Sequence, residues 1–540
     1  MAGWSRRHVL HGIAATGVAA CRASPPIRQP TTDGATTDTT GPVTSGTVPT
    51  TGSPPKMPNI LYLYADQHRA PMLGCMGHPI VQSPNIDALA GEGVTFTNQF
   101  TNSPLCVPAR TTMMTGWMAH VTGAWTNDMY APSTGLSHVR DLRDQAGYET
   151  AIVGKAHLYK NKGHPADILN VTKLMGWGFD YVFELLSQPD TAHTPNAYQD
   201  FLDARDVAYP DGLGPRISRY AAYVDEFDYY TMPAIDVAPY SLTHDENLDV
   251  FCGRHARDWL LARSDSRPFY LQVNFPGPHK PYDSTTETRN AIDLADPALL
   301  PGILGPPGDP MSAMVQFIWQ QKGLFGMTAE ESKYFLMQYY AKIAMIDQTV
   351  GEIIDALKAT GQYENTWIIY GADHGDMLGD HEIWGKVVMY EGAIRTPLII
   401  RPPGGATGWQ ATGMCDQKDI TASIVAMAGL TTDHLPGTSL LNRIAGGAAG
   451  PEAQSGHAEV YAEVIGDEWD LRFKTAMMRD GRYKLVYDVD EDKPTDFFDL
   501  EADPIEKVNL VFDPAYEAQI SVGMQKIKDL LLQEVPATST

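Results

Sequence analysis

Cysteine is scarce in this sequence, with five among 540 residues, too few to build a disulfide scaffold. Basic residues are outnumbered as well: 40 Lys and Arg stand against 65 Asp and Glu, which gives a net charge of −25 at pH 7. Because nucleic acids bind to basic surfaces, this balance argues against a nucleic-acid partner. The sequence also lacks an apolar run of the roughly 20 residues that a membrane-spanning helix needs. What is present is a chain long enough to bury a sizeable core and to hold more than one domain.

The first 21 residues are typical of a targeting signal. Arg6 and Arg7 form a twin arginine just ahead of a short, weakly apolar run at 12–20, as in signals for Tat export. The letters VAAC, ending at Cys21, resemble a bacterial lipobox, in which Cys21 would be lipidated and become the mature N-terminus. The alternative is a plain cleaved signal in which Cys21 is incidental. We therefore expect an exported protein, either periplasmic or anchored to a membrane or cell surface as a lipoprotein.

Composition divides the rest of the chain into three parts. Residues 22–57 are dominated by Thr, Pro, Ser and Gly, which predicts a disordered linker. Residues 58–445 alternate predicted strands and helices, which indicates an α/β domain with a large, mixed but mostly parallel sheet flanked by helices. A glycine-rich hinge at 446–450 precedes a smaller α+β subdomain, 446–540. Its elements are short antiparallel strands at 473–479, 483–489 and 496–499 and a helix at 514–534.

Three segments of the main domain have less obvious roles. Residues 179–240 are rich in Tyr, Asp and Pro and show weak periodicity, which predicts an irregular insertion that could wall a substrate pocket. Residues 294–325 are predicted to form a lid or surface loop. Residues 328–360 carry apolar residues at helical spacing, which predicts a long core helix.

Potential metal ligands follow two predicted buried strands. The strand predicted at 59–64 is followed by Asp66, and the strand predicted at 366–370 is followed by Asp373 and His374. Continuous apolar runs of strand length are typical of a sheet covered on both faces. The carboxyl ends of parallel strands meet at the edge where α/β proteins bind ligands. Each Asp alone could cap a turn, but together these residues are candidate metal ligands.

Basic residues follow other predicted strands. Lys155 and His157 lie two apart on an extended segment, so their side chains point to the same side. His279 lies between prolines at the exit of the strand predicted at 269–275, held as rigidly as a general acid requires. Lys386 places a further cation shortly after Asp373 and His374. Taken singly, each of these residues could be a solvated or capping side chain.

The stretch around Cys106 has a physical logic of its own. Cys106 stands at the predicted mouth of a helix, with Pro108 at an early helical position and Arg110 one turn in. Proline suits the first helical turn because its missing N–H would be unpaired there anyway. The free amides and partial positive charge of a helix N-terminus then favour an anion beside the cysteine. A buried structural cysteine is the alternative for this motif taken alone.

In this order the motifs resemble those of the type I, formylglycine-dependent sulfatases of the alkaline phosphatase superfamily. The resemblance runs from residue 58 to about residue 535. It includes the strand-Asp motif, Cys-x-Pro-x-Arg with Thr-Gly, Gly-Lys-x-His, Pro-His-x-Pro-Tyr, Asp-His-Gly and Trp-Gly-Lys. It implies an alkaline phosphatase-like fold for the catalytic domain and the hydrolysis of sulfate monoesters in a sulfated small molecule or carbohydrate.

The resemblance also implies how the nucleophile arises. Cys106 would be converted to Cα-formylglycine by a formylglycine-generating enzyme, directed by Pro108 and Arg110. One hydroxyl of the hydrated aldehyde attacks sulfur, and the second, once deprotonated, expels sulfate and regenerates the aldehyde. Arg110 and Lys155 would neutralise the hydrated aldehyde and His157 would help to deprotonate it. His279 would protonate the leaving alkoxide, Lys386 would bind a sulfate oxygen, and Asn127 is a further substrate-contact candidate.

By the same resemblance, Asp66, Gln67, Asp373 and His374 would hold a divalent cation together with residue 106. Oxygen ligands favour Ca²⁺, whereas Gln67 and His374, where many relatives have Asp and Asn, leave Mn²⁺ or Mg²⁺ open.

Two departures from the commonest pattern matter. Ala109 stands where many relatives have Ser, and the single Asp followed by Gln67 is shared with choline-sulfatase-like and phosphonate monoester hydrolase branches. Lys155 and His157 favour a sulfatase. The alternatives are a phosphonate monoester or phosphodiester hydrolase and a non-catalytic surface lipoprotein that binds sulfated ligands.

Overall fold

The structure is a computed structural model that describes residues 57–127, 136–158, 168–208, 211–226, 242–303, 305–322, 328–465 and 473–534. The described residues all belong to one compact unit, Pro55–Thr540. The predicted signal with Cys21 and nearly all of the predicted linker lie outside the described residues. In the described ranges, no helix has both the length and the apolar character needed to cross a membrane.

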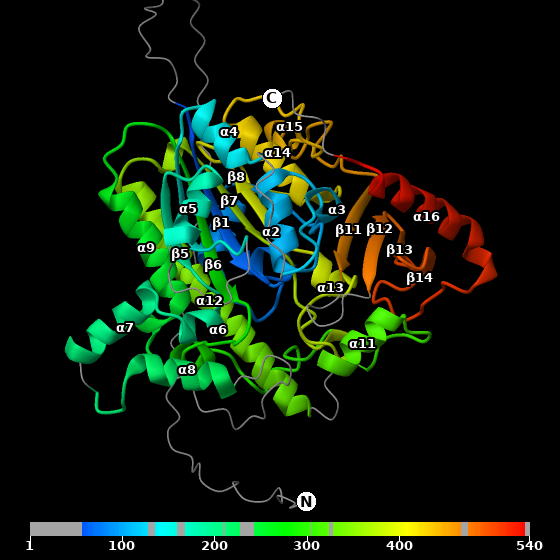
Figure 1. Ribbon diagram of the computed structural model, residues 1–540, viewed down its shortest axis with the longest axis horizontal. Coiled ribbons are helices and arrows are strands. Elements are labelled where there is room, and N and C mark those ends of the chain that lie inside the picture. The colour runs from blue at the N-terminus through cyan, green and yellow to red at the C-terminus, as the bar shows by residue number, and fades with distance from the viewer. Residues whose placement is uncertain are drawn as a thin grey trace, which may run out of the picture. The chain divides into compact units, whose positions relative to one another are not determined.

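A large sheet forms the centre of this unit (Figure 1). Its strands are β1 (Asn59–Asp66), β2 (Val94–Phe96), β4 (Glu149–Lys155), β5 (Tyr181–Leu185), β6 (Phe269–Pro278), β7 (Thr366–Ala372), β8 (Leu398–Arg401) and β9 (Trp409–Ala411). Within the described residues, these eight strands are ordered β5-β4-β6-β1-β7-β8-β2-β9. The neighbouring strands β5, β4, β6, β1 and β7 run parallel, whereas β8 is antiparallel to both β7 and β2. The predicted α/β fold with a mixed, mostly parallel sheet is confirmed.

The two faces of the sheet bury two different cores, which explains the continuous apolar run of β1. Leu61 and Leu63 pack in the core that also holds side chains of α1 (Pro84–Gly91), α9 (Leu248–Ala262) and α12 (Ala329–Ala359). Tyr62 and Tyr64 point to the other core, with α2 (Cys106–Thr115), α4 (His138–Asp144) and α14 (Gln417–Met427). Alternate side chains of a strand face opposite sides, so a strand covered on both faces must be apolar throughout.

The C-terminal part is a second sheet of antiparallel strands, drawn in orange to red in Figure 1. It consists of β11 (Glu459–Ile465), β12 (Lys474–Asp480), β13 (Tyr483–Asp488) and β14 (Lys493–Asp499), in that order. Met478 and Leu485 pack with α16 (Glu517–Leu531), whereas Met477 and Val486 face the core shared with the segment after β7. The antiparallel C-terminal sheet was predicted, but its first strand, β11, was not. The predicted boundary at residue 446 stays a prediction.

Two predicted irregular segments are more regular than expected. The described part of 179–240 contains β5, α6 (Gln188–His193), α7 (Ala197–Ala208) and α8 (Arg216–Glu226), and the loop predicted at 294–325 contains α11 (Ala313–Lys322). In α8, Tyr220, Tyr223 and Val224 are buried at helical spacing. Their period was hidden because tyrosine does not stand out as apolar in a sequence rich in Asp and Pro. The predicted irregular structure of these segments was wrong, whereas their roles as a pocket wall and a lid stay predictions.

The remaining elements are short. The two-stranded pair is β3 (Gln99–Phe100) with β10 (Cys415–Asp416), and the other helices are α3 (Ala119–Thr122), α5 (Ile168–Gly176), α10 (Thr286–Asn290), α13 (Glu391–Ile394) and α15 (Leu441–Ala445). Single 3₁₀ turns occupy Gly74–Met76, His244–Glu246, Tyr363–Asn365, Asp380–Glu382 and Pro514–Tyr516.

Candidate active site

The register of the parallel strands brings several predicted site residues to one edge of the sheet. Ala65 of β1 pairs with Ala372 of β7, and Gly154 of β4 pairs with Asn274 of β6. The next residues in the chain therefore leave the sheet side by side: Asp66, Asp373 and Lys155 at the strand ends, and His279 just after β6. Gly154 permits the close approach of β4, because a Cβ there would lie 2.1 Å from the carbonyl oxygen of Asn274.

Asp66 and Asp373 form a buried network with two cations. The ammonium group of Lys155 donates to Oδ2 of Asp66, and Nη2 of Arg110 lies 3.3 Å from the same oxygen. Nε of Arg110 donates to Oδ2 of Asp373 at 2.9 Å. Burial raises the pKa of Asp66, yet Lys155 and its other cationic neighbours hold that pKa well below the ordinary carboxyl value. Asp66 is therefore a carboxylate, and the cations Lys155 and Arg110 lie against Oδ2 of Asp66 and Oδ2 of Asp373.

Cys106 is the first residue of α2 and lies at the centre of this network. Nζ of Lys386 is 2.7 Å from its Sγ, and Nε2 of His374 is 3.3 Å away. Burial and the charge of Asp66 raise the pKa of the thiol, but Lys386 and its other cationic neighbours outweigh them and lower it well below the ordinary value. The site thus stabilises an anion at position 106, as the start of a helix also does.

The arrangement of His374 fixes which of its nitrogens faces the site. Nδ1 lies 3.0 Å from the carbonyl oxygen of Gly375, so this nitrogen carries the proton. Nε2 then offers a lone pair, and it lies 3.0 Å from Nζ of Lys386. Holding the second nitrogen by a hydrogen bond is how metal-binding histidines are usually oriented.

The donor atoms at this edge fit a divalent cation. In the part of the chain that is described, Asp66, Cys106, Asp373 and His374 place one potential ligand atom each within 4.8 Å of one another. Gln67 adds an observation of its own: its Oε1 is buried and has no hydrogen-bond partner among the described residues. A buried amide oxygen without a partner is costly unless something else binds it.

His157 and His279 also face this cluster. The pKa of His157 is lowered, first by burial and then by Lys155, while a hydrogen bond with Cys106 acts in the opposite direction. His279 donates from Nδ1 to the carbonyl oxygen of Lys280, 2.6 Å away. Burial and then Lys386 lower the pKa of His279 well below the ordinary value, so its imidazole is neutral in the free protein.

Asn127 lies at the start of α2, beside Cys106, and makes a structural contact there. Its Oδ1 accepts a hydrogen bond from the backbone N–H of Val107, 3.0 Å away. Leu105, the N-cap residue of α2, has no side chain that could do so. Asn127 therefore satisfies one free amide at the helix start, and a contact between Asn127 and substrate stays a prediction.

Comparison with known proteins identifies the family. A model of the family described as Sulfatase matches residues 58–430, more than half of the chain. The chain belongs to the sulfatase family. A second model, described as N-sulphoglucosamine sulphohydrolase, C-terminal, matches residues 379–533 of this sulfatase.

The relatives support the same assignment. The sulfatase is 30% identical to the choline-sulfatase of Rhizobium meliloti, over 85% of this chain and 83% of that protein. It is 28% identical to an ulvan-active sulfatase of Formosa agariphila, over 86% of this chain and 79% of that protein. Among solved structures, it is similar to the phosphonate monoester hydrolase of Agrobacterium radiobacter, with a TM-score of 0.71, 24% identity and coverage of 88% and 95% of the two chains. The family and these named sulfatases make the protein a sulfuric ester hydrolase, whereas the last similarity concerns the fold alone.

The backbone of the sulfatase is strained at two predicted site residues and directly after a third. Gln67 has φ 65°, His157 has φ 46°, and Val387, which follows Lys386, has φ 82°. Left-handed backbone costs about 1–3 kcal/mol at residues other than glycine and persists only where the surroundings enforce it. Here the surroundings include a hydrogen bond from the N–H of Val387 to the carbonyl oxygen of Pro104, 3.2 Å away, two residues before Cys106.

A buried ion triad holds the loop of the sulfatase that carries His279. Nζ of Lys342, from α12, lies 2.6 Å from Oδ2 of Asp249 and in close contact with Oδ1 of Asp283. Oδ1 of Asp249 accepts the N–H of Gly277 at 2.7 Å. Gly277 and Asp283 flank His279 on either side, so the triad clamps both ends of this loop.

A second cluster of metal-ligand residues has a structural role. Asp416, Asp419 and His457 also lie within 4.8 Å of one another. Asp416 and Asp419 form a capping box at the start of α14, and Nζ of Lys418 lies 2.5 Å from Asp416. His457 binds Asp419 through Nε2 at 2.7 Å. The carboxylates already have partners, so this cluster is a helix cap.

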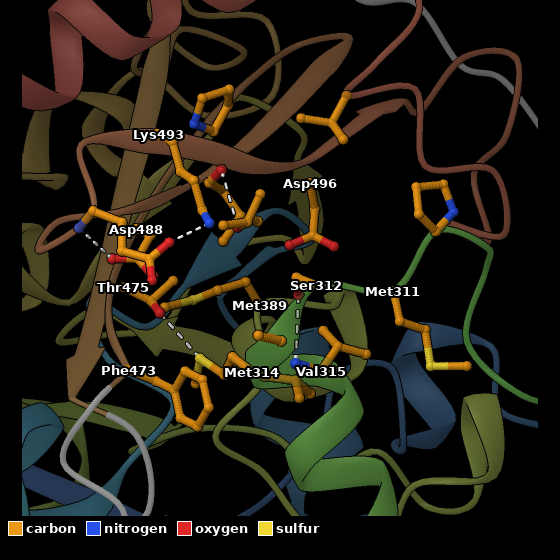
Figure 2. Close-up of a pocket in the computed structure, with 18 of the residues that line it drawn as sticks. Met311, Ser312, Met314, Val315, Met389, Phe473, Thr475, Asp488, Lys493 and Asp496 are labelled. Atoms are coloured by element: carbon orange, nitrogen blue, oxygen red, sulfur yellow. Dashed lines mark hydrogen bonds and ion pairs between the residues drawn. The ribbon is translucent and has the colours of Figure 1, made fainter.

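A cavity of about 660 Å³ lies between the start of α11 and the C-terminal sheet (Figure 2). Met314, Met389 and Phe473 contribute apolar walls, and the carboxyl group of Asp496 faces the same space. Among the described residues that line it, none is a predicted site residue. The predicted site residues therefore gather at the edge of the main sheet and not around this cavity.

Several supporting residues were missed from the sequence. Nε2 of Gln417 donates to the carbonyl oxygen of Asp373 at 2.8 Å, and Nδ2 of Asn274 donates to that of Lys155 at 2.9 Å. The guanidinium of Arg110 lies 5.1 Å from the ring centre of Tyr64. No motif marks these residues, because each acts on the site from a different element.

The ion triad yields a stability prediction. Replacing Lys342 by Met leaves Asp249 and Asp283 buried without their cation, which costs about 3–5 kcal/mol of the free energy of unfolding. Urea denaturation would measure this loss. The control is Lys358→Met, an exposed lysine on the same helix, for which we expect a change of about 0.5 kcal/mol or less. Equal effects of the two substitutions would contradict the role given to the triad.

Proposed function

We propose that this sulfuric ester hydrolase cleaves sulfate monoesters with a formylglycine formed from Cys106 and with a bound divalent cation. One observation carries the proposal: Cys106 begins a helix inside the buried cluster of Asp66, Asp373 and His374, with Lys386 at 2.7 Å. A hydrated aldehyde at this position supplies a hydroxyl nucleophile and, after transfer, a second hydroxyl through which sulfate is expelled. An unmodified thiol lacks this second route.

The residues that would hold the cation are Asp66, Gln67, Asp373 and His374, together with residue 106. When bound, the cation polarises the sulfate group and favours the ionised nucleophile. Three oxygen-bearing side chains support Ca²⁺, whereas the imidazole of His374 is equally compatible with Mn²⁺ or Mg²⁺.

The remaining residues handle charge and protons. Lys386, Lys155 and Arg110 gather positive charge where the transferred sulfate group carries negative charge. His157, neutral because burial and Lys155 lower its pKa, can accept a proton from the residue at position 106. His279 can supply a proton to the leaving oxygen, and a bound sulfate ester would counteract the low pKa caused by burial and Lys386.

The named relatives support a substrate class. A choline-sulfatase and an ulvan-active sulfatase are among them, which supports a sulfated small molecule or carbohydrate as substrate. A formylglycine-generating enzyme would be the partner in maturation. The phosphonate hydrolase alternative rests on similarity of fold, and a fold does not determine chemistry. The pair formed by the buried Lys155 and the half-buried His157 favours sulfate.

The first test concerns the nucleophile. Peptide mass spectrometry after co-expression with a formylglycine-generating enzyme should show Cys106 converted, and Cys106→Ala should abolish hydrolysis of a chromogenic aryl sulfate without loss of the folded state. Cys252→Ala, at a buried cysteine outside the site, is the control and should keep activity. A thiol at position 106 in fully active enzyme would refute the mechanism, and equal turnover of phosphonate and sulfate monoesters would favour the alternative.

The second test concerns the general acid. Replacing His279 by Ala should slow the hydrolysis of alkyl sulfates by about 10²- to 10⁴-fold, because a poor leaving group needs the proton. Hydrolysis of 4-nitrophenyl sulfate should be slowed much less, since its leaving group departs as an anion. Values of kcat/KM for a series of leaving groups measure this difference, and a uniform loss across the series would exclude the role.

We also propose export through the Tat route, with lipidation at Cys21. The support is the twin arginine, the short apolar run and the lipobox-like letters before Cys21. Cys21→Ala should release the protein from the membrane fraction in cell fractionation, whereas replacing Arg6 and Arg7 by Lys should retain it in the cytoplasm. Continued membrane association of the Cys21→Ala variant would refute lipidation at this residue.

A further inference from the structure

Asp376 is a fully buried acid that the sequence motifs did not single out and that the proposed mechanism does not use. It lies two residues beyond His374, and it is the acceptor in all four of its described side-chain hydrogen bonds. Oδ2 accepts from Nε2 of Gln67 at 2.5 Å and from the hydroxyl of Tyr282 at 3.1 Å. Oδ1 accepts from the backbone N–H groups of Leu378 and Gly385, each at 2.9 Å.

These contacts decide the orientation of the Gln67 amide. A side-chain amide has one donating and one accepting end, and its hydrogen-bond partners decide which end lies where. Both oxygens of Asp376 accept hydrogen bonds and Nε2 of Gln67 donates to its Oδ2, so the NH₂ group of Gln67 faces Asp376. The oxygen Oε1 is then left buried and without a partner among the described residues. Asp376 therefore leaves the oxygen of Gln67, and not the nitrogen, available to a cation.

Two further contacts join Asp376 to other parts of the site. Tyr282 belongs to the loop of His279, and burial and Asp376 raise the pKa of its hydroxyl well above the ordinary value, so it stays a donor. Gly385 immediately precedes Lys386 in the chain. One carboxylate thus contacts the Gln67 side chain and the segments that carry the proposed acid and a sulfate-binding lysine.

We propose that Asp376 is a positioning residue that fixes the amide of Gln67 with its oxygen free to bind the divalent cation. This inference rests on the proposed function, because it assumes that Gln67 is a ligand. Groups that orient metal ligands typically change metal affinity by about 10- to 100-fold when they are removed.

The test exchanges donor and acceptor between the two residues. In Asp376→Asn, the new NH₂ group cannot accept from Gln67, so the Gln67 amide must turn its oxygen toward residue 376 and present its nitrogen to the site. We expect the affinity for Mn²⁺, Ca²⁺ or Mg²⁺ to fall about 10- to 100-fold, measured by calorimetry or chelator competition on the full chain. Gln67→Glu alone sets two carboxylates against each other and should also weaken binding.

The double variant Gln67→Glu with Asp376→Asn should restore affinity to within a few-fold of the wild type. There, one oxygen of the new glutamate accepts from the Asn side chain and the other is free for the cation. Tyr282→Phe is the matched control, since it removes a hydrogen bond to the same oxygen of Asp376 without touching Gln67. We expect its metal affinity to be that of the wild type.

The outcomes separate this inference from the proposed function. Wild-type metal affinity in a folded Asp376→Asn variant would overturn the inference, as would a folded double variant that is no better than either single variant. The double variant keeps this second test in force even if Asp376→Asn alone does not fold, which thermal unfolding of each variant would show. A wild-type chain that binds none of the three cations would refute the proposed metal site as well as this inference, whereas a metal-binding wild type with an insensitive Asp376→Asn variant refutes the inference alone.

Discussion

The carboxylate of Asp66, fully buried at the end of β1, is the constraint on which the site depends. A charge removed from water is tolerated only when other charges and donors surround it. Lys155 and Arg110 supply that compensation from β4 and α2, and Arg110 reaches Asp373 as well. Each of these side chains would be costly to bury alone, so the network forms as a whole. The strand ends and the start of α2 are thereby locked together.

The same network leaves room for chemistry on its inner side. Oδ2 of Asp66 and Oδ2 of Asp373 contact the side chains of Lys155 and Arg110. Oδ1 of Asp66 instead faces Sγ of Cys106 and Nε2 of His374, each 3.9 Å away. Gln417 donates a hydrogen bond to the backbone carbonyl of Asp373, and Asn274 donates one to that of Lys155. Side chains held from behind in this way reach the site already oriented, which lowers the cost of organising it when substrate arrives.

Fold and chemistry have to be argued separately for this protein. Its backbone resembles that of a phosphonate monoester hydrolase with a TM-score of 0.71, while its family and its named relatives are sulfatases. One fold can serve the hydrolysis of either sulfate or phosphonate esters, because both groups are tetrahedral oxyanions and a fold does not determine chemistry. The side chains that surround residue 106 therefore have to be considered separately from the fold. Here Lys155 and His157 both interact with the residue at position 106. These interactions are a property of the site residues and not of the fold.

The sequence by itself determined the main sheet and indicated side chains that the fold gathers at its edge, because both leave local marks. Apolar runs of strand length show where β1 and β7 lie, and polar residues at their ends show which side chains reach the edge. It did not reveal α8, whose buried tyrosines hide the helical period, or Asp376 as a partner of Gln67, 309 positions away in the chain. Only the tertiary structure decided that Asn127 caps α2 and that Lys342 clamps the loop of His279. The physical reason is that a motif records which groups lie near one another along the chain, whereas hydrogen bonds and ion pairs between distant segments depend on how the strands pair and the helices pack.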